Sequence, residues 1–127
     1  MSAAVCLALA IFLEGGIEPP QGQIAVGWSV VNSSTTLHKR PHRICTEVFS
    51  GRYMAVNSMG EFPKGERWRQ TIILARDILS GRIPDPTGGA QFFECTKWAS
   101  CKKVPWWSVG MEVKGLFGSQ HFFKDTR

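Results

Sequence analysis

The sequence lacks the segments and motifs that would place it in several large protein classes. Its apolar N-terminal stretch, residues 1–13, is too short to span a bilayer. No basic segment precedes this stretch and no small-residue cleavage site follows it, as they would in a signal peptide. There is also no G-x-x-x-x-G-K-[ST] phosphate loop, no G-x-S-x-G elbow and no H-E-x-x-H pair. We therefore expect a buried N-terminal helix, with no stable membrane insertion.

The spacing of the cysteines does not suit a metal site. The chain has four cysteines, Cys6, Cys45, Cys95 and Cys101, and no C-x2-C spacing, so we expect no bound metal. Four cysteines allow three disulfide pairings. Cys95 and Cys101 are close in sequence in a loop-like stretch and are the pair we expect. Cys6 lies in an apolar helix, where a small buried thiol is the expected state.

The composition is that of one globular domain with a basic surface. The chain has 127 residues, of which 43% are hydrophobic and 20% charged, so we predict a single domain over residues 1–127. The net charge of +5 favours polyanionic partners. The basic residues are scattered, and their densest cluster, residues 38–43, is either a solvated loop or a polyanion-binding patch. Five Trp and eight Phe are many for this length; some of them belong in the core, and a domain that binds sugars or other flat ligands would also carry such an excess.

The periodicity predicts a mainly helical fold. Residues 5–14 form an Ala- and Leu-rich helix that is apolar on nearly all faces, which belongs in the interior, and the following Gly-Gly ends it. A second helix runs from Pro20 to about residue 31, and residues 65–80 form the clearest amphipathic helix. We predict one or two helical turns at residues 43–49 and a long loop at residues 50–64.

The aromatic C-terminal third predicts a small β element. Candidate strands are residues 90–93, 104–107 and 120–123, after strong turn chemistry at residues 85–89. The predicted fold class is therefore α+β, a mainly helical domain with a small antiparallel β element.

Glu14 is the strongest candidate for catalysis. The negative end of the helix dipole and the apolar neighbours Ile11, Phe12 and Leu13 both disfavour its ionised form and so raise its pKa. A carboxylic acid that is protonated near neutral pH is what protonation of a glycosidic oxygen requires. The alternative is an exposed Glu that merely ends a helix.

The other candidates each have a structural alternative. Asn32 is either a neighbour of Glu14 in a helix hairpin or a helix C-cap. The turn containing Thr87, Gly88 and Ala90 either brings backbone amides close to a sugar or is only a turn. His121 is either an orienting acid–base group or a structural residue.

The order of these motifs resembles the SleB-type cell wall hydrolases, the spore cortex-lytic enzymes and their phage and bacterial relatives. The similarity runs from about Val5 to Lys124. It rests on four segments: F-L-E-G-G followed by Q-G-Q-I-A-V-G-W-S-V-V-N, then I-C-T-E-V-F, D-P-T-G-G-A-Q-F-F, and the closing Gly, His and aromatic cluster. The sequence departs from the family at Arg52-Tyr53, where Gln-Phe is usual, and at Glu94, and it has one extra residue between Gly118 and His121.

The resemblance implies a lysozyme-like or transglycosylase-like fold and a cofactor-free lytic transglycosylase. Glu14 would cleave the bond between N-acetylmuramic acid and N-acetylglucosamine in peptidoglycan glycan strands. The resemblance also implies a substrate-binding set: Asn32, Tyr53, Thr87, Gly88, Ala90, Phe92, His121 and Phe122. We expect a monomeric, bare catalytic unit with no nucleic-acid partner. It would act on the bacterial cell wall, made in the host cytoplasm and released for phage lysis if it is an endolysin, or secreted if it is bacterial.

Two other functions remain open. A hydrolytic muramidase would need a second carboxylate. Glu18, Glu61 and Asp85 are the candidates, and none has telling spacing. A non-enzymatic module for glycan or nucleic acid would use the tryptophans, with the basic cluster at residues 38–43. Those tryptophans are Trp98, Trp106 and Trp107.

Overall fold

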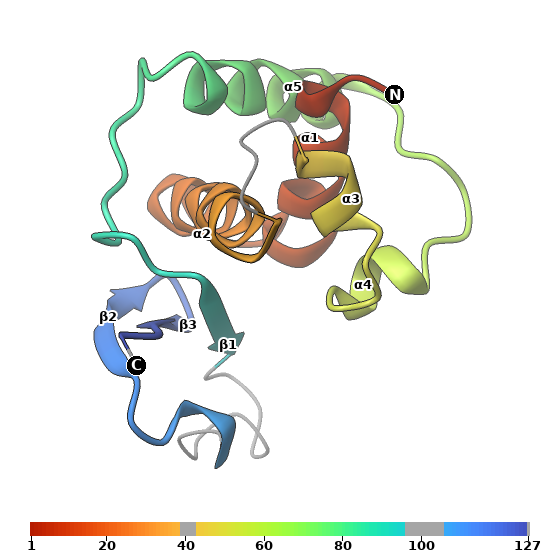
Figure 1. Ribbon diagram of the computed structural model, residues 1–127. Coiled ribbons are helices and arrows are strands. Elements are labelled where there is room, and N and C mark those ends of the chain that lie inside the picture. Colours follow the sequence, from red (N-terminus) through yellow and green to blue (C-terminus); the bar gives the residue numbers. More distant parts are fainter. Residues whose placement is uncertain (39–42, 96–105, 127) are drawn as a thin grey trace.

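The computed structural model describes residues 1–38, 43–95 and 106–126 (Figure 1). The helices are α1 (Ala3–Gly15), α2 (Pro20–His38), α3 (Ile44–Val48), α4 (Met54–Asn57) and α5 (Glu66–Leu79). The strands are β1 (Phe92–Cys95), β2 (Glu112–Phe117) and β3 (Gln120–Lys124), and a 3-10 helix, η2, covers Trp106–Ser108. Trp98, Cys101 and most of the basic cluster lie outside the described residues.

Helix α1 is the centre of the helical layer (Figure 1). Six consecutive residues, from Cys6 to Ile11, are fully buried. Helices α2, α3, α4 and α5 all contact α1, so every face of α1 meets another element. This explains why the sequence of α1 is apolar all round. Within the described part of the chain, none of the helices has the length and apolarity needed to cross a bilayer.

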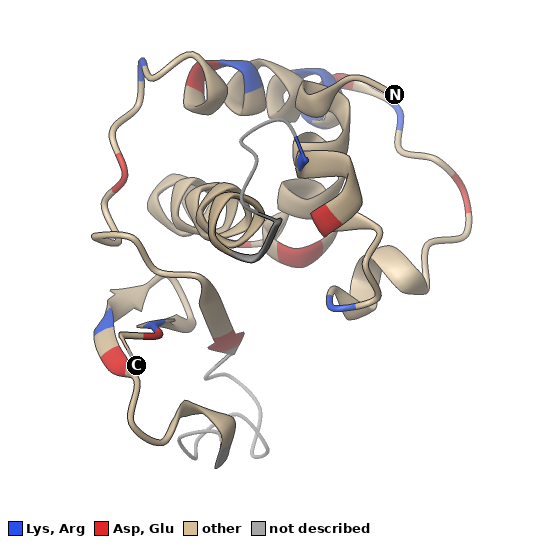
Figure 2. Ribbon diagram, viewed as in Figure 1, with Lys and Arg blue, Asp and Glu red and all other residues tan. Residues whose placement is uncertain are grey.

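Helix α2 joins the helical layer to the sheet. It carries no Lys, Arg, Asp or Glu along its length (Figure 2). A Cβ atom at Gly27 would lie 2.6 Å from Cδ1 of Ile78 and 2.9 Å from Cδ1 of Ile11, so a glycine is what lets α2 approach α1 and α5 closely. Its other face forms a second apolar cluster with the sheet, in which Ala25 and Val26 pack with Ala90 and Phe122.

The sheet is antiparallel with strand order β1-β3-β2. Phe92 pairs with Phe123 and Glu94 with His121 across β1 and β3. The sheet confirms the predicted small antiparallel β element, and with the five helices it confirms the predicted fold class. The sequence analysis missed β2, which has a bulge between Val113 and Gly115 and no regular alternation of buried and exposed residues.

Besides the second helix, which does not end near residue 31 but runs on to His38, two predicted segments need correction. The segment 50–64 is not a continuous loop, because residues 54–57 form the short helix α4 against α1. The predicted strand at 104–107 ends in the 3-10 helix η2, and residues 104 and 105 lie outside the described part. In both cases a tertiary contact or turn set the local conformation where the sequence had no clear period.

One disulfide joins α1 to α3. Cys6 bonds to Cys45 across 39 residues of sequence, with their Cα atoms 5.2 Å apart. The prediction that Cys6 is a free buried thiol is therefore wrong, although its burial is correct. Packing of α3 against α1 brings the two cysteines together, and sequence proximity gave no hint of it. The predicted pair of Cys95 with Cys101 involves a residue outside the described part of the chain.

Candidate active site

A pocket of about 550 Å³ opens between the C-terminal end of α1, the segment before α4, and the sheet. It contains two carboxyl groups, one guanidinium and several aromatic rings. The lining residues are Glu14, Arg52, Tyr53, Met54, Gln91, Phe92, Phe93, Glu94, Trp107, Met111 and Gln120. A cavity of this size accommodates a sugar-sized ligand.

Glu14 enters this pocket from the last turn of α1 and is half-buried. The backbone N–H of Ala55 donates to its Oε1 at 2.9 Å, and Nε2 of Gln120 donates to its main-chain oxygen at 3.3 Å. Burial raises the pKa of Glu14, and the negative charge of Glu94 raises it further. The amide hydrogen bonds from Ala55 and Val56 oppose this shift without cancelling it. The pKa of Glu14 is therefore higher than that of an exposed Glu, and its carboxyl group faces an open pocket.

The sheet side of the pocket is aromatic. Phe92 lies 5.7 Å from Trp107 between ring centroids, and Trp107 lies 5.4 Å from Phe123 in an edge-to-face arrangement. Phe93 packs on Phe122, with ring centroids 5.6 Å apart, and so ties this wall to the core. Flat rings beside a polar pocket are the surfaces that carbohydrate-binding sites present.

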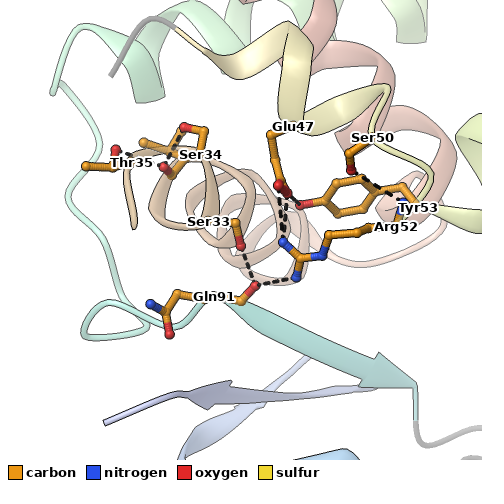
Figure 3. A network of polar contacts seen from close by, with 9 residues as sticks. Ser33, Ser34, Thr35, Glu47, Ser50, Arg52, Tyr53 and Gln91 are labelled. Carbon is orange, nitrogen blue, oxygen red and sulfur yellow. Dashed lines mark hydrogen bonds and ion pairs between the residues drawn. The ribbon is translucent and has the colours of Figure 1, made fainter. Parts of the chain in front are cut away.

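An ion pair between Arg52 and the buried Glu47 fixes the third wall (Figure 3). Nη1 of Arg52 donates to both oxygens of Glu47, at 2.8 and 3.2 Å, and the hydroxyl of Tyr53 donates to Glu47 at 3.0 Å. Arg52 also reaches the main-chain oxygen of Gln91 at 3.4 Å and lies over the ring of Phe92, 4.8 Å from its centroid. Glu47 thereby holds Arg52 and Tyr53 at the pocket.

The Asp85 loop, residues 85–90, forms a separate polar cluster. The carboxylate of Asp85 accepts hydrogen bonds from the N–H and hydroxyl of Thr87, at 2.8 and 2.6 Å, from the N–H of Gly89 at 3.0 Å, and from Nδ2 of Asn32 at 3.0 Å. Asn32 also donates to the main-chain oxygen of Ala90 at 2.9 Å. Burial works to raise the pKa of Asp85, but these hydrogen bonds outweigh it and lower the pKa.

The structure brings together only part of the predicted substrate-binding set. Within the described residues, Glu14, Tyr53 and Phe92 line the pocket. The side chains of Asn32 and Thr87 both donate hydrogen bonds to the carboxylate of Asp85. Gly88 lies against Lys114. Ala90 and Phe122 are fully buried in the second apolar cluster. His121 is half-buried in β3, outside the pocket lining. Glu18, a candidate second acid, binds the N–H and hydroxyl of Ser119 instead.

The sequence analysis did not assign several pocket residues to the site. Glu94 and Arg52 were noted only as departures from a family pattern, and Trp107 only as a residue of an alternative binding module. The strand sequence Phe92-Phe93-Glu94 did carry a signal, because a carboxylate in a short aromatic strand needs a polar or open environment.

Comparison with protein families identifies the chain. The model of the Cell Wall Hydrolase family matches residues 17–123, which is most of the chain. The chain belongs to the cell wall hydrolase family. Glu14 lies three residues before the matched range, and every other residue that lines the pocket lies within it. Comparison with curated proteins gives no match.

Two solved structures show the same fold as this cell wall hydrolase. One is the catalytic domain of the Bacillus cereus SleB protein, with a TM-score of 0.72, 23% identity, and coverage of 96% of this chain and 89% of that chain. The other is the catalytic domain of the germination-specific lytic transglycosylase SleB from Bacillus anthracis, with a TM-score of 0.69, 22% identity, and coverage of 96% and 93%. The predicted family and architecture are confirmed.

Proposed function

We propose that residues 1–127 form a single catalytic domain that cleaves peptidoglycan as a lytic transglycosylase, with Glu14 as its acid. The bond cleaved would be that between N-acetylmuramic acid and N-acetylglucosamine. The observation that carries the proposal is the raised pKa of a half-buried carboxyl group that faces an open, aromatic-walled pocket. The raised pKa lets such a group keep its proton to a higher pH than an exposed Glu, and the group can deliver that proton to a glycosidic oxygen.

The proposed reaction needs only this one acid. Glu14 gives its proton to the glycosidic oxygen as the bond to the anomeric carbon of the muramic acid breaks. The C6 hydroxyl oxygen of the same sugar then bonds to the anomeric carbon, and the hydroxyl proton passes to the Glu14 carboxylate. The product is a 1,6-anhydro ring and Glu14 is protonated again, with no cofactor or activated water required.

Substrate binding would involve the walls of the same pocket. Tyr53 and Phe92 line it beside Glu14, and Trp107 extends the aromatic surface. We propose that these rings stack on the apolar faces of the sugars. Asn32, Thr87, Gly88, Ala90, His121 and Phe122 would then support the site indirectly, by holding the Asp85 loop and the sheet against α2.

The proposed place of action is the cell wall. The net charge of +5 favours adsorption to an anionic wall in a salt-dependent manner. A disulfide between Cys6 and Cys45 suits an oxidising environment outside the cytoplasm. Peptidoglycan glycan strands are the proposed partner, and the protein would act as a monomer.

Turbidity clearing and product analysis test this function. We expect Glu14→Gln to reduce clearing of purified peptidoglycan sacculi by at least about 1,000-fold, because an amide has no proton to donate. Its thermal unfolding should match that of the wild type to within a few degrees. Mass spectrometry should find anhydromuropeptides in the wild-type digest. Clearing by Glu14→Gln at the wild-type rate would refute the role of Glu14, and reducing-end products, heavier by one water, would replace the transglycosylase with a hydrolase.

A further inference from the structure

We propose that Glu94 is a second catalytic carboxylate of this pocket, which stabilises the positive charge that develops on the sugar when the glycosidic bond breaks. The inference rests on the proposed function and adds a residue to it. Glu94 stands at a position where the sequence departs from its family's pattern, so the role would belong to this chain.

Two different elements bring the carboxyl groups into one pocket. Glu14 comes from the end of α1 and Glu94 from β1, and both line the same cavity of about 550 Å³. Figure 2 shows acidic residues at the C-terminal end of α1 and at the end of β1. The helical wall and the sheet wall therefore each supply one acid.

A contact through the neighbouring strand fixes their relative positions. Gln120 pairs with Cys95 across β1 and β3, and its Nε2 donates to the main-chain oxygen of Glu14 at 3.3 Å. This hydrogen bond joins the end of α1 to the sheet, one residue along the strand pairing from Glu94. Gln120 is only 6% exposed, so the surrounding packing fixes this contact.

The electrostatics give the two carboxyl groups different tasks. Burial and then the negative charge of Glu94 favour the protonated form of Glu14, which suits a proton donor. The reacting sugar passes through an oxocarbenium-like transition state, so a negative charge beside the anomeric carbon lowers its energy. A proton donor on the helical wall and a second carboxyl group on the sheet wall of the same pocket meet both needs.

Other charged and titratable groups face this pair. Arg52 and Tyr53 line the same pocket, but the guanidinium of Arg52 and the hydroxyl of Tyr53 both bind Glu47. His121 is the cross-strand partner of Glu94 on β3. Any effect of replacing Glu94 is therefore measured with these other groups still present.

The test replaces the charge of Glu94 and keeps its shape. We expect Glu94→Gln to lower the rate of muropeptide release from purified sacculi by roughly 100-fold, the usual loss for one electrostatic group in an active site. Loss of a negative charge near Glu14 also lowers the pKa of Glu14, so the upper limb of the pH–rate profile should move to lower pH. Glu94→Asp, which keeps the charge, should retain most of the activity and the wild-type pH limb.

The matched control is Glu112→Gln on the neighbouring strand β2, which removes an exposed carboxylate outside the pocket and should leave rate and pH profile unchanged. The Glu94 assignment is overturned if Glu94→Gln cleaves within twofold of the wild type while Glu14→Gln is inactive, a result that leaves the proposed function intact. Equal losses in Glu94→Gln and Glu94→Asp, with an unshifted pH limb, would also overturn it, because they indicate a structural role. Full activity in both Glu14→Gln and Glu94→Gln would instead refute the proposed function itself.

Discussion

The Asp85 loop and the Glu14 pocket use the same functional group in opposite ways. The carboxylate of Asp85 accepts four hydrogen bonds from Asn32, Thr87 and Gly89, and these lower its pKa below the ordinary value. The carboxyl of Glu14 accepts hydrogen bonds from the main-chain amides of Ala55 and Val56, and burial raises its pKa in spite of them. The fold satisfies the first group with its own donors and leaves the second facing a cavity.

This difference distinguishes the Asp85 loop, which stabilises the fold, from the Glu14 pocket, which is the candidate active site. An ionised carboxylate that receives four hydrogen bonds stabilises the native state, whereas a half-buried one held beside another acid costs stability. Proteins keep such unfavourable groups mainly where function needs them. On this ground we propose that the D-P-T-G-G-A segment, a substrate-binding candidate in the sequence, anchors the sheet, and that the reactive group lies at the end of α1.

The largest effect we expect in the Asp85 loop is on stability. Asp85→Ala removes the acceptor of four hydrogen bonds and leaves the buried Thr87 hydroxyl and the Asn32 amide without it, so the free energy of unfolding should fall by about 3 kcal/mol. Peptidoglycan clearing by the protein that remains folded should persist, because Asp85 is absent from the pocket lining among the described residues. Chemical denaturation and clearing assays at low temperature measure the two quantities.

A surface aspartate provides the control for this loss. Asp77 pairs with the 80%-exposed side chain of Arg82 at 3.8 Å, so Asp77→Ala should cost less than about 1 kcal/mol. The comparison fails if Asp85→Ala is as stable as Asp77→Ala, or if it is well folded and inactive.

The sequence predicted the helical layer better than the sheet. The burial of α1 follows from an apolar pattern on all its faces, and the amphipathic pattern gave α5 within a residue at each end. The raised pKa of Glu14 was predictable because its position at a helix end beside apolar neighbours is a local feature of the sequence. Strand β2 was not, since its exposed Val113 and Leu116 and the bulge beside Gly115 hide the alternation.

Long-range packing produced the remaining differences. The disulfide partner of Cys6 depends on where α3 packs, and the burial of Glu47 depends on Arg52 and Tyr53 folding back over it. No local period carries this information. Glu94 illustrates the same limit, because only the approach of β1 to the end of α1 turns a strand residue into a neighbour of Glu14.

Arg52 is intermediate between the two regions, because it is hydrogen-bonded to Glu47 like the groups of the Asp85 loop and also lines the Glu14 pocket. Arg52→Gln takes the cationic partner from Glu47, whose side chain is 1% exposed. We expect a loss of about 2 kcal/mol, below the range for fully buried pairs because Arg52 itself is 29% exposed. The double variant Glu47→Gln/Arg52→Gln should regain at least half of it, as measured by denaturant unfolding.

The exposed pair of Arg69 and Glu66 supplies the reference for Arg52. Arg69 is 70% exposed, so Arg69→Gln should change the free energy of unfolding by less than about 1 kcal/mol. An Arg52→Gln variant no less stable than Arg69→Gln would mean that the ion pair with Glu47 does not hold this wall.

The smallest effects concern pH, and here the two carboxyl groups should differ in sign. The pKa of Glu14 is raised, so its contribution to stability is present below the ordinary value of 4.5 and is lost as pH rises through the folded-state pKa. The pKa of Asp85 is lowered, so its contribution is present above the ordinary value of 3.8 and is lost as pH falls through the folded-state pKa. Relative to the wild type, Glu14→Gln should therefore be more stable at pH 7 and Asp85→Asn less stable. The Glu14→Gln difference should shrink toward pH 4, whereas the Asp85→Asn difference should persist there and shrink only as the pH falls below 3.8, as measured by guanidinium unfolding across this range. If both variants change the free energy of unfolding in the same direction at pH 7, the contrast between the hydrogen-bonded carboxylate of Asp85 and the carboxyl group of Glu14 with its raised pKa is wrong.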